Sequence, residues 1–171
     1  MRARPISCCF SGYRPAKLPW GGDEDDPRCQ ALKRRLRDAI VAAWEEGYSH
    51  FICGMAQGVD LYCCEIALEL RKTRPITVEA AIPYPGQAED WAPDQRERYH
   101  NLVAACDYET VVSETYTPSC MQRRNRYMVD HASLLIAVFD GQSGGTQNTI
   151  QYAMERGLEI VDIPPVLESI Q

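Results

Sequence analysis

Two glycine-rich turns contain the residue types that could bind an anion. In the first, residues 51–60, an apolar run stops at Gly54, a second glycine follows at Gly58, and a helical pattern opens at Val59. The second, Gly-Gln-Ser-Gly-Gly-Thr at 141–146, stands in the same strand-to-helix setting. Such a setting lets backbone N–H groups meet a phosphate at a helix N-terminus. The first turn has neither the G-x-G-x-x-G spacing nor the lysine of a P-loop, so it does not by itself specify a nucleotide site.

The late turn is the better candidate for a phosphate site. Gly144 and Gly145 can present backbone N–H groups, and Thr146 adds a hydroxyl at the helix start. The glycines of the earlier turn then give the ligand room. Asp60 either offers a hydrogen bond to a ribose or a base, or only complements the helix dipole and caps the first turn.

Arginines supply the positive charge that a phosphate requires. Arg14 follows the first expected strand, in a turn where Gly12 can adopt a left-handed conformation and Pro15 blocks continuation of the strand. Arg14 is therefore either a solvated loop charge or an anion contact from the first loop. Arg124 is a second candidate cation, whereas the arginines beside it fit a solvated helix face.

Strands and helices are expected to alternate from end to end. Apolar runs predict strands at residues 5–10, 50–53, 77–82, 108–113, 133–139 and 159–163. Periodicity and capping residues predict helices from Asp26 and Pro27 to Gly47, over residues 59–72, 93–106 and 119–132, and from the late turn to Gly157. Inward helix faces are expected at Leu32, Leu36, Ile40 and Ala43, at Leu61, Cys64, Ala67 and Leu68, and at Ile150, Ala153 and Met154.

This alternation predicts a Rossmann-like three-layer α/β/α fold with a mostly parallel sheet, in a single domain over residues 1–171. In such sheets, ligands bind at the carboxyl ends of the strands, near the point where the strand order reverses. The candidate glycines, Arg14 and Thr146 all lie at these ends, on different loops, so we expect one shared pocket. Tyr84 and Trp91, on the loop after the third strand, either stack a planar ligand or cover an edge of the core.

Composition narrows the class of protein. The 171 residues include 45% apolar and 25% charged residues, and no apolar run reaches the length of a membrane span. We therefore expect a cytoplasmic protein, bacterial in style. The net charge of −6 argues against a nucleic-acid footprint over the whole surface, but not against a local positive pocket. The eight cysteines form no C-x-x-C pair and fall mostly in apolar runs, which predicts reduced core thiols and no metal site.

Several motifs stand in an order that is typical of a known family. They are residues 12–15 (GYRP), 18–20 (LPW), 54–60 (GMAQGVD), 81–83 (AIP) with Gly86, Gln87 and Trp91, 124–125 (RN) with 127–130 (YMVD), and 137–141 (AVFDG) with 144–146 (GGT). Together they resemble the YpsA-type proteins of the SLOG superfamily, which also contains the DNA-processing protein DprA and the Lonely-guy phosphoribohydrolases. The resemblance implies a Rossmann-like fold and a pocket for a nucleotide-derived ligand, with NAD or ADP-ribose proposed for the YpsA branch. It also implies links to bacterial cell division and stress, and self-association.

Two departures limit what the resemblance carries over. Lonely-guy enzymes have a motif similar to P-G-G-x-G-T-x-x-E, in which the glutamate serves catalysis. Here that glutamate is absent, because Thr146 is followed by Gln147, Asn148, Thr149 and Ile150. DprA shares the turn at 54–60 and binds DNA, but this chain is acidic and has no evident basic stripe with interleaved aromatics.

Three functional hypotheses follow. The first is a binding or sensing module that needs no cofactor and takes a nucleotide-like ligand, such as NAD or ADP-ribose, with a protein partner or a second copy reading the bound state. The second is a hydrolase of N-glycosidic or phosphoester bonds, with Asp60, Glu65, Asp130 or Asp140 as acid or base. The third is single-stranded DNA binding in the DprA manner, which the charge disfavours. The expected ligand-binding residues are Gly12, Arg14, Gly54, Gly58, Asp60, Arg124, Asn125, Asp140, Gly144, Gly145 and Thr146.

Overall fold

The computed structural model describes residues 6–167. Its strands are β1 (Ile6–Ser11), β2 (Tyr48–Cys53), β3 (Thr77–Ile82), β4 (Tyr108–Val111), β5 (Leu134–Val138) and β6 (Glu159–Ile163). Its α-helices are α1 (Pro27–Glu45), α2 (Val59–Arg71), α3 (Pro93–Ala105), α4 (Cys120–Asp130) and α5 (Gly145–Glu155), and a 3₁₀ turn, η1, spans Pro15–Lys17. Strand and helix alternate along the chain, as the apolar periodicity predicts.

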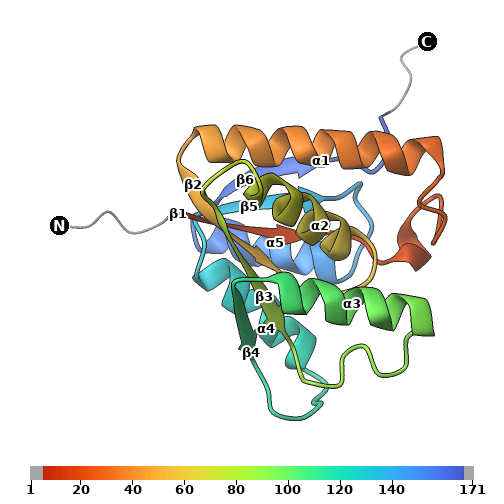
Figure 1. Cartoon of the computed structure of the whole chain (residues 1–171). Coiled ribbons are helices and arrows are strands. Elements are labelled where there is room, and N and C mark those ends of the chain that lie inside the picture. Colours follow the sequence, from red (N-terminus) through yellow and green to blue (C-terminus); the bar gives the residue numbers. More distant parts are fainter. Residues whose placement is uncertain (1–5, 168–171) are drawn as a thin grey trace.

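The strands form one parallel sheet in the order β4-β3-β2-β1-β5-β6. The chain builds outward from β1 to β4 and then returns to place β5 on the other side of β1. The strand order therefore reverses between β1 and β5, and a crevice is expected there, at the carboxyl ends of both strands. Helices α1, α2 and α3 lie on one face of the sheet, and α4 and α5 lie on the other (Figure 1). The predicted three-layer α/β/α fold is confirmed.

Alternation along the strands divides the core between the two faces of the sheet. In β1, Cys8 and Phe10 pack with the helices α1 to α3, whereas Cys9 packs with α4 and α5. In β5, Leu134 and Ile136 take the first side, and the intervening Leu135 takes the second. β5 is buried at every position, as its unbroken apolar run predicts for a strand covered on both faces.

Several details differ from the expected elements. Strand β2 begins at Tyr48 and not at residue 50, and β4 ends at Val111 and not at residue 113. The predicted inward face of α5 included Met154, which was wrong, because Met154 is 66% exposed. Thr146, Thr149 and Ala153 are the buried residues of α5, and short side chains at this spacing let the helix approach β1 and β5 closely. The first strand begins at Ile6, and the predicted Pro5 lies outside the described residues.

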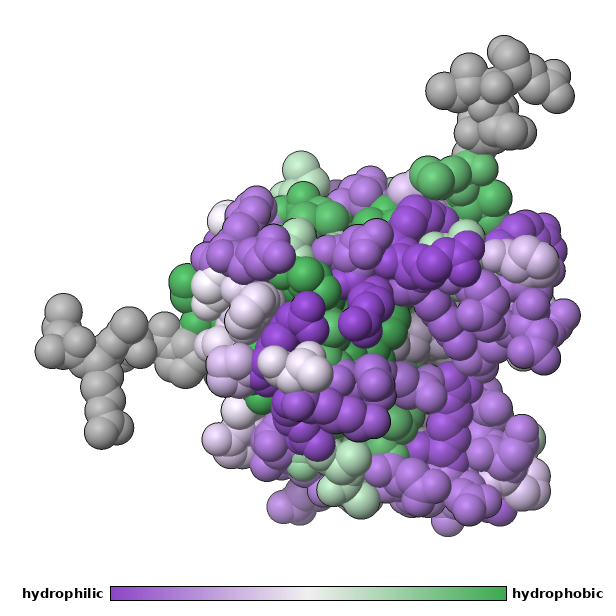
Figure 2. Space-filling view, turned by 45° about the horizontal axis from the view of Figure 1, so that its top comes forward, coloured by the Kyte–Doolittle hydropathy of each residue, from purple (hydrophilic) through white to green (hydrophobic). Residues whose placement is uncertain are grey.

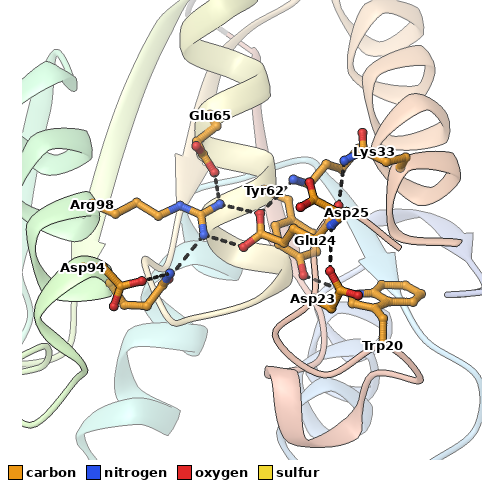
Figure 3. A network of polar contacts seen from close by, with 11 residues as sticks. Trp20, Asp23, Glu24, Asp25, Lys33, Tyr62, Glu65, Asp94 and Arg98 are labelled. Atoms are coloured by element: carbon orange, nitrogen blue, oxygen red, sulfur yellow. Dashed lines mark hydrogen bonds and ion pairs between the residues drawn. The ribbon is translucent and has the colours of Figure 1, made fainter. Parts of the chain in front are cut away.

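The loop before α1 is attached to the layer of helices by charged side chains. Asp26 caps α1 by accepting a hydrogen bond from the backbone N–H of Arg28 at 2.8 Å, as predicted. Arg98 of α3 reaches between Glu24 of this loop, at 2.6 and 2.8 Å, and Glu65 of α2 (Figure 3). Although burial would raise the pKa of Glu24, its hydrogen bonds from Arg98 and Lys33 lower it. The network therefore favours the charged form of Glu24.

The cysteines behave as small core residues. All eight are free thiols, seven are buried, and Cys106 is partly exposed. Within residues 6–167, no group of three or more His, Cys, Asp or Glu side chains could hold a metal ion. None of the helices in this described range is long and apolar enough to cross a membrane. Figure 2 shows a face on which hydrophilic residues predominate and hydrophobic ones form separate patches.

Candidate functional site

A cavity of about 330 Å³ opens at the carboxyl ends of β1 and β5, where the strand order reverses. It brings together seven of the predicted residues, which come from the loop after β1, from the first turns of α2 and α5, and from α4. They are Gly12, Arg14, Asp60, Arg124, Asn125, Gly145 and Thr146. The volume lies within the range of small-molecule sites. The expectation of one shared pocket therefore agrees with the geometry.

The start of α5 forms one wall of this cavity. Its N-cap is Gly144, which has a φ of 137° and provides no side chain to cap the helix. Because the first N–H groups of a helix have no partner within the helix, those of Gly145 and Thr146 are available to an acceptor in the cavity. Thr146 is only 7% exposed and adds its hydroxyl to the same wall. An anion bound here would also interact favourably with the helix dipole.

A buried charged pair forms the inner wall. Arg124 of α4 is 3% exposed and donates a short hydrogen bond to the carbonyl oxygen of Gly54. Its Nε also donates to Oδ1 of Asn125 at 2.9 Å. Asp60 is 7% exposed and accepts a hydrogen bond from the backbone N–H of Ala56 at 3.2 Å. In one cavity wall, an arginine is able to pair with an anionic group and a carboxylic acid to hydrogen-bond to a hydroxyl or an amine.

Burial shifts the proton equilibria of both groups. It raises the pKa of Asp60, and the nearby charge of Arg124 opposes this shift only in part. It lowers the pKa of Arg124, although the negative charge of Asp60 acts in the opposite direction. An anionic ligand is expected to interact strongly with this buried arginine, because an ion pair in a low-dielectric environment is strong.

The sequence interpretation missed two side chains that line the cavity. Lys17, at the end of η1, lines the cavity mouth, and its Nζ donates to the carbonyl oxygen of Ser143 at 2.6 Å. Tyr13 also lines the cavity. Its hydroxyl donates to Asp140 at 2.7 Å and accepts from the backbone N–H groups of Asp140 and Gln142. The available signal was the position of both residues beside Gly12 and Arg14, on the loop after the first strand.

Four predicted residues lie beside the cavity but do not line it: Gly54, Gly58, Asp140 and Gly144. Asp140 holds Tyr13, and Gly54 is in contact with Asp60 and Arg124. Gly58 has a φ of 90°, and a Cβ there would lie 2.5 Å from the carbonyl oxygen of Tyr13. These residues therefore position the loops whose side chains line the cavity, and they do not themselves line it.

The other candidate acids and aromatic side chains are engaged elsewhere. Glu65 pairs with Arg98, and Asp130 accepts a hydrogen bond from Tyr152 at 2.7 Å. Among the four candidate acids, only Asp60 lines the cavity. The rings of Tyr84 and Trp91 pack against other tyrosines, at centroid distances of 5.4 and 5.2 Å, and neither lines the cavity.

Helix α4, which carries Arg124 and Asn125, is attached to the sheet by a polar cluster. The hydroxyl of Tyr127 donates to Glu79 of β3 at 2.6 Å, and Glu79 also contacts His50 at 2.7 Å and Thr110 at 2.9 Å. Burial would raise the pKa of Glu79, but these three hydrogen bonds lower it. The carboxylate therefore links strands β2, β3 and β4 to α4 and fixes the position of the cavity wall.

Known proteins have sequences similar to this chain. The chain is similar to the uncharacterized SPbeta prophage-derived protein YoqJ of Bacillus subtilis (strain 168), with 32% identity over 137 residues, covering 70% of this chain and 80% of that protein. It is also similar to a UPF0398 protein of Bacillus thuringiensis (strain Al Hakam), with 26% identity over 153 residues, covering 88% of this chain and 83% of that protein.

Among solved structures, DNA processing protein A (DprA) from Streptococcus pneumoniae matches with a TM-score of 0.63 and 16% identity. The match covers 97% of this chain but only 52% of that one. DprA from Helicobacter pylori, whose structure describes a single-stranded DNA binding mode, matches with a TM-score of 0.62 and 13% identity over 92% of this chain and 65% of that one. These identities show a common fold. The model of the YpsA family, described as the YspA SLOG family, matches residues 8–162, and the chain therefore belongs to this family.

Proposed function

We propose that this protein binds a nucleotide or nucleotide-derived ligand, such as NAD or ADP-ribose, with a phosphate at the start of α5. The observation that carries the proposal is Arg124, a nearly buried arginine that faces a cavity in an acidic protein. Burying a guanidinium is costly unless an anion compensates it, and Asp60 does so only in part. The uncapped start of α5, with Arg14 and Lys17 at the mouth, completes an anion site.

The proposed role is that of a module that senses or sequesters its ligand without turnover. The free, mostly buried cysteines favour a reducing compartment, so the proposal places the protein in the cytoplasm. A protein partner or a second copy of the chain would recognise the ligand-bound form. Membership of the YpsA family extends the proposal to bacterial cell division or stress.

The test is a thermal-shift screen with AMP, ADP, ADP-ribose and NAD. A variant that combines Gly145→Ala with Thr146→Val is expected to lose the ligand-induced rise in melting temperature. A Cβ at position 145 meets nothing within 4 Å, so the variant should fold. Thr73→Val, at an exposed residue beyond the end of α2, is the matched control. A full thermal shift in the double variant would show that the start of α5 is not the phosphate site.

A second candidate function is hydrolysis of an N-glycosidic or phosphoester bond. The observation that favours it is Asp60, an acid with a raised pKa that lines the cavity. Such a carboxyl can hold a proton for a leaving group. Incubation with nucleoside monophosphates, NAD and ADP-ribose should then yield a product in the wild type and none in Asp60→Asn. Stoichiometric binding without product would favour the binding module over the hydrolase.

Single-stranded DNA is a third candidate ligand, because a structural neighbour is described by its single-stranded DNA binding mode. This neighbour makes the expectation that nucleic acid is an unlikely partner doubtful. Arg14 and Lys17 at the cavity mouth are the groups that a strand would meet first. A shift of labelled single-stranded DNA that weakens steeply with salt, and that ADP-ribose displaces, would support this function.

A further inference from the structure

A second cavity, of about 310 Å³, lies between α4 and α5 and continues the first one. The two cavities share Met121, Asn125 and Gly145 in their walls. Gly145 stands at the start of α5, where the phosphate is proposed to bind, and Asn125 faces it from α4. A ligand held by its phosphate at this junction can therefore extend into the second cavity, which we call the α4–α5 groove.

The chemistry of the groove differs from that of the first cavity. One wall carries the partly buried ring of Tyr152, with the guanidinium of Arg126 at 5.3 Å from its centroid. Met121 adds an apolar, polarisable surface. The side-chain amides of Gln122 and Asn148 line the same groove, and within residues 6–167 neither makes a hydrogen bond. Flat stacking surfaces with free amide groups are the means by which proteins recognise nucleobases.

The first cavity is less suited to a base. Its inner wall consists of the buried charges of Arg124 and Asp60. Burying a base edge against these charges would leave them poorly hydrated.

We infer that the α4–α5 groove is the base subsite of the nucleotide whose phosphate lies at the start of α5. This inference rests on the proposed function, and it assigns Tyr152 and Asn148 as residues that determine specificity. The ligand class is a nucleoside phosphate: the phosphate lies at Gly145, the ribose beside Asn125 at the junction of the two cavities, and the heterocycle beside Tyr152. Asn148 and Gln122 then meet the hydrogen-bonding edge of the base.

The test compares AMP with ribose 5-phosphate by calorimetry, because the two differ at C1′, which carries adenine in AMP and a hydroxyl in ribose 5-phosphate. Wild-type protein is expected to bind AMP roughly tenfold more tightly than ribose 5-phosphate. Asn148→Leu, which replaces an exposed amide and adds apolar bulk in the groove, should remove this difference, and so should Tyr152→Leu, which removes the flat ring. Gln151→Leu is the matched control, at an exposed amide of the same helix that lies outside both cavity walls.

The outcomes separate the inference from the proposed function. The inference holds if both groove variants lose the preference for AMP while their affinity for ribose 5-phosphate stays within about twofold of wild type. It is overturned if the preference survives in both variants, since the base then lies elsewhere. It is also overturned if both ligands weaken equally, because the groove then acts only through the phosphate site. If wild-type protein binds neither ligand and also shows no thermal shift with ADP-ribose or NAD, the proposed function itself fails.

Discussion

Asp60 and Arg124 lie against the same glycine. A Cβ placed on Gly54 would be 2.9 Å from Oδ2 of Asp60 and 3.1 Å from Cζ of Arg124. The buried acid of α2 and the buried cation of α4 are thus positioned from opposite faces of the sheet by the end of one strand, β2. Their spacing depends on a residue without a side chain.

Gly54→Ala is therefore expected to push these charged groups apart. We expect a loss of about 1–3 kcal/mol in the free energy of unfolding, as for overpacking elsewhere, and a loss of the ligand-induced thermal shift. Denaturant unfolding and a thermal-shift assay measure the two effects. Gly22→Ala serves as control, because a Cβ there meets nothing within 4 Å. Equal behaviour of the two variants would show that the inner wall tolerates the added methyl group.

Asp60 should make stability fall as pH rises. Burial raises its pKa in the folded state above the unfolded value of about 3.9, so between these two values the folded protein binds more protons than the unfolded chain. The wild type should lose stability relative to Asp60→Asn as pH increases through this window. Melting temperatures of both proteins from pH 4 to pH 8 test the prediction. A difference that does not change with pH would mean that Asp60 does not titrate there.

Lys17 should contribute to ligand affinity in a salt-dependent way. It carries a full charge at the exposed mouth of the cavity, so Lys17→Met is expected to weaken binding of ADP-ribose roughly fivefold, ~1 kcal/mol, at low salt. The loss should diminish at about 0.5 M salt, because salt screens the attraction between exposed charges. Calorimetry at two salt concentrations measures it, with the exposed Lys72→Met as control. The same loss in Lys72→Met would indicate a general charge effect and no local contact.

Arg98 is expected to stabilise the fold without affecting the ligand. Arg98→Met leaves Glu24 with Lys33 alone and frees Glu65, which should cost about 1–3 kcal/mol of unfolding free energy at pH 7. Because the network lowers the pKa of Glu24, its contribution is present above the unfolded value of about 4.3 and is lost as pH falls through the folded value. Urea unfolding at pH 7 and pH 3 checks this, with exposed Arg34→Met as control. An unchanged difference at pH 3 would contradict the assigned role of Glu24.

Periodicity was sufficient to predict the fold. The third and sixth strands have the predicted bounds, Thr77–Ile82 and Glu159–Ile163, because apolar runs bounded by turn residues define strand ends well. Met154 shows the limit of this reasoning. An apolar residue near the end of a helix can extend past the sheet, and only the tertiary position of α5 places it in solvent.

The site was predictable at the level of loops but less so at the level of residues. Parallel topology brings the loops after β1 and β5 together, so Arg14, Gly145 and Thr146 could be expected in one cavity. A glycine in the sequence does not reveal what approaches it. Gly58 makes room for the backbone of Tyr13, where a ligand had been expected. Lys17 was missed because an exposed lysine has no pattern of its own until the loop is folded against Ser143.

During synthesis, one of the two strands that pair with β1 emerges much later than the other. It can pair with β2 early, but the edge that faces β5 stays open until residue 138 has left the ribosome. The proposed anion site needs both edges, because Arg14 follows β1 and Gly145 follows β5. A chain that terminates before α5 therefore lacks the proposed phosphate site. One that terminates before β5 also exposes an unpaired central strand, and such truncated chains should aggregate and be degraded.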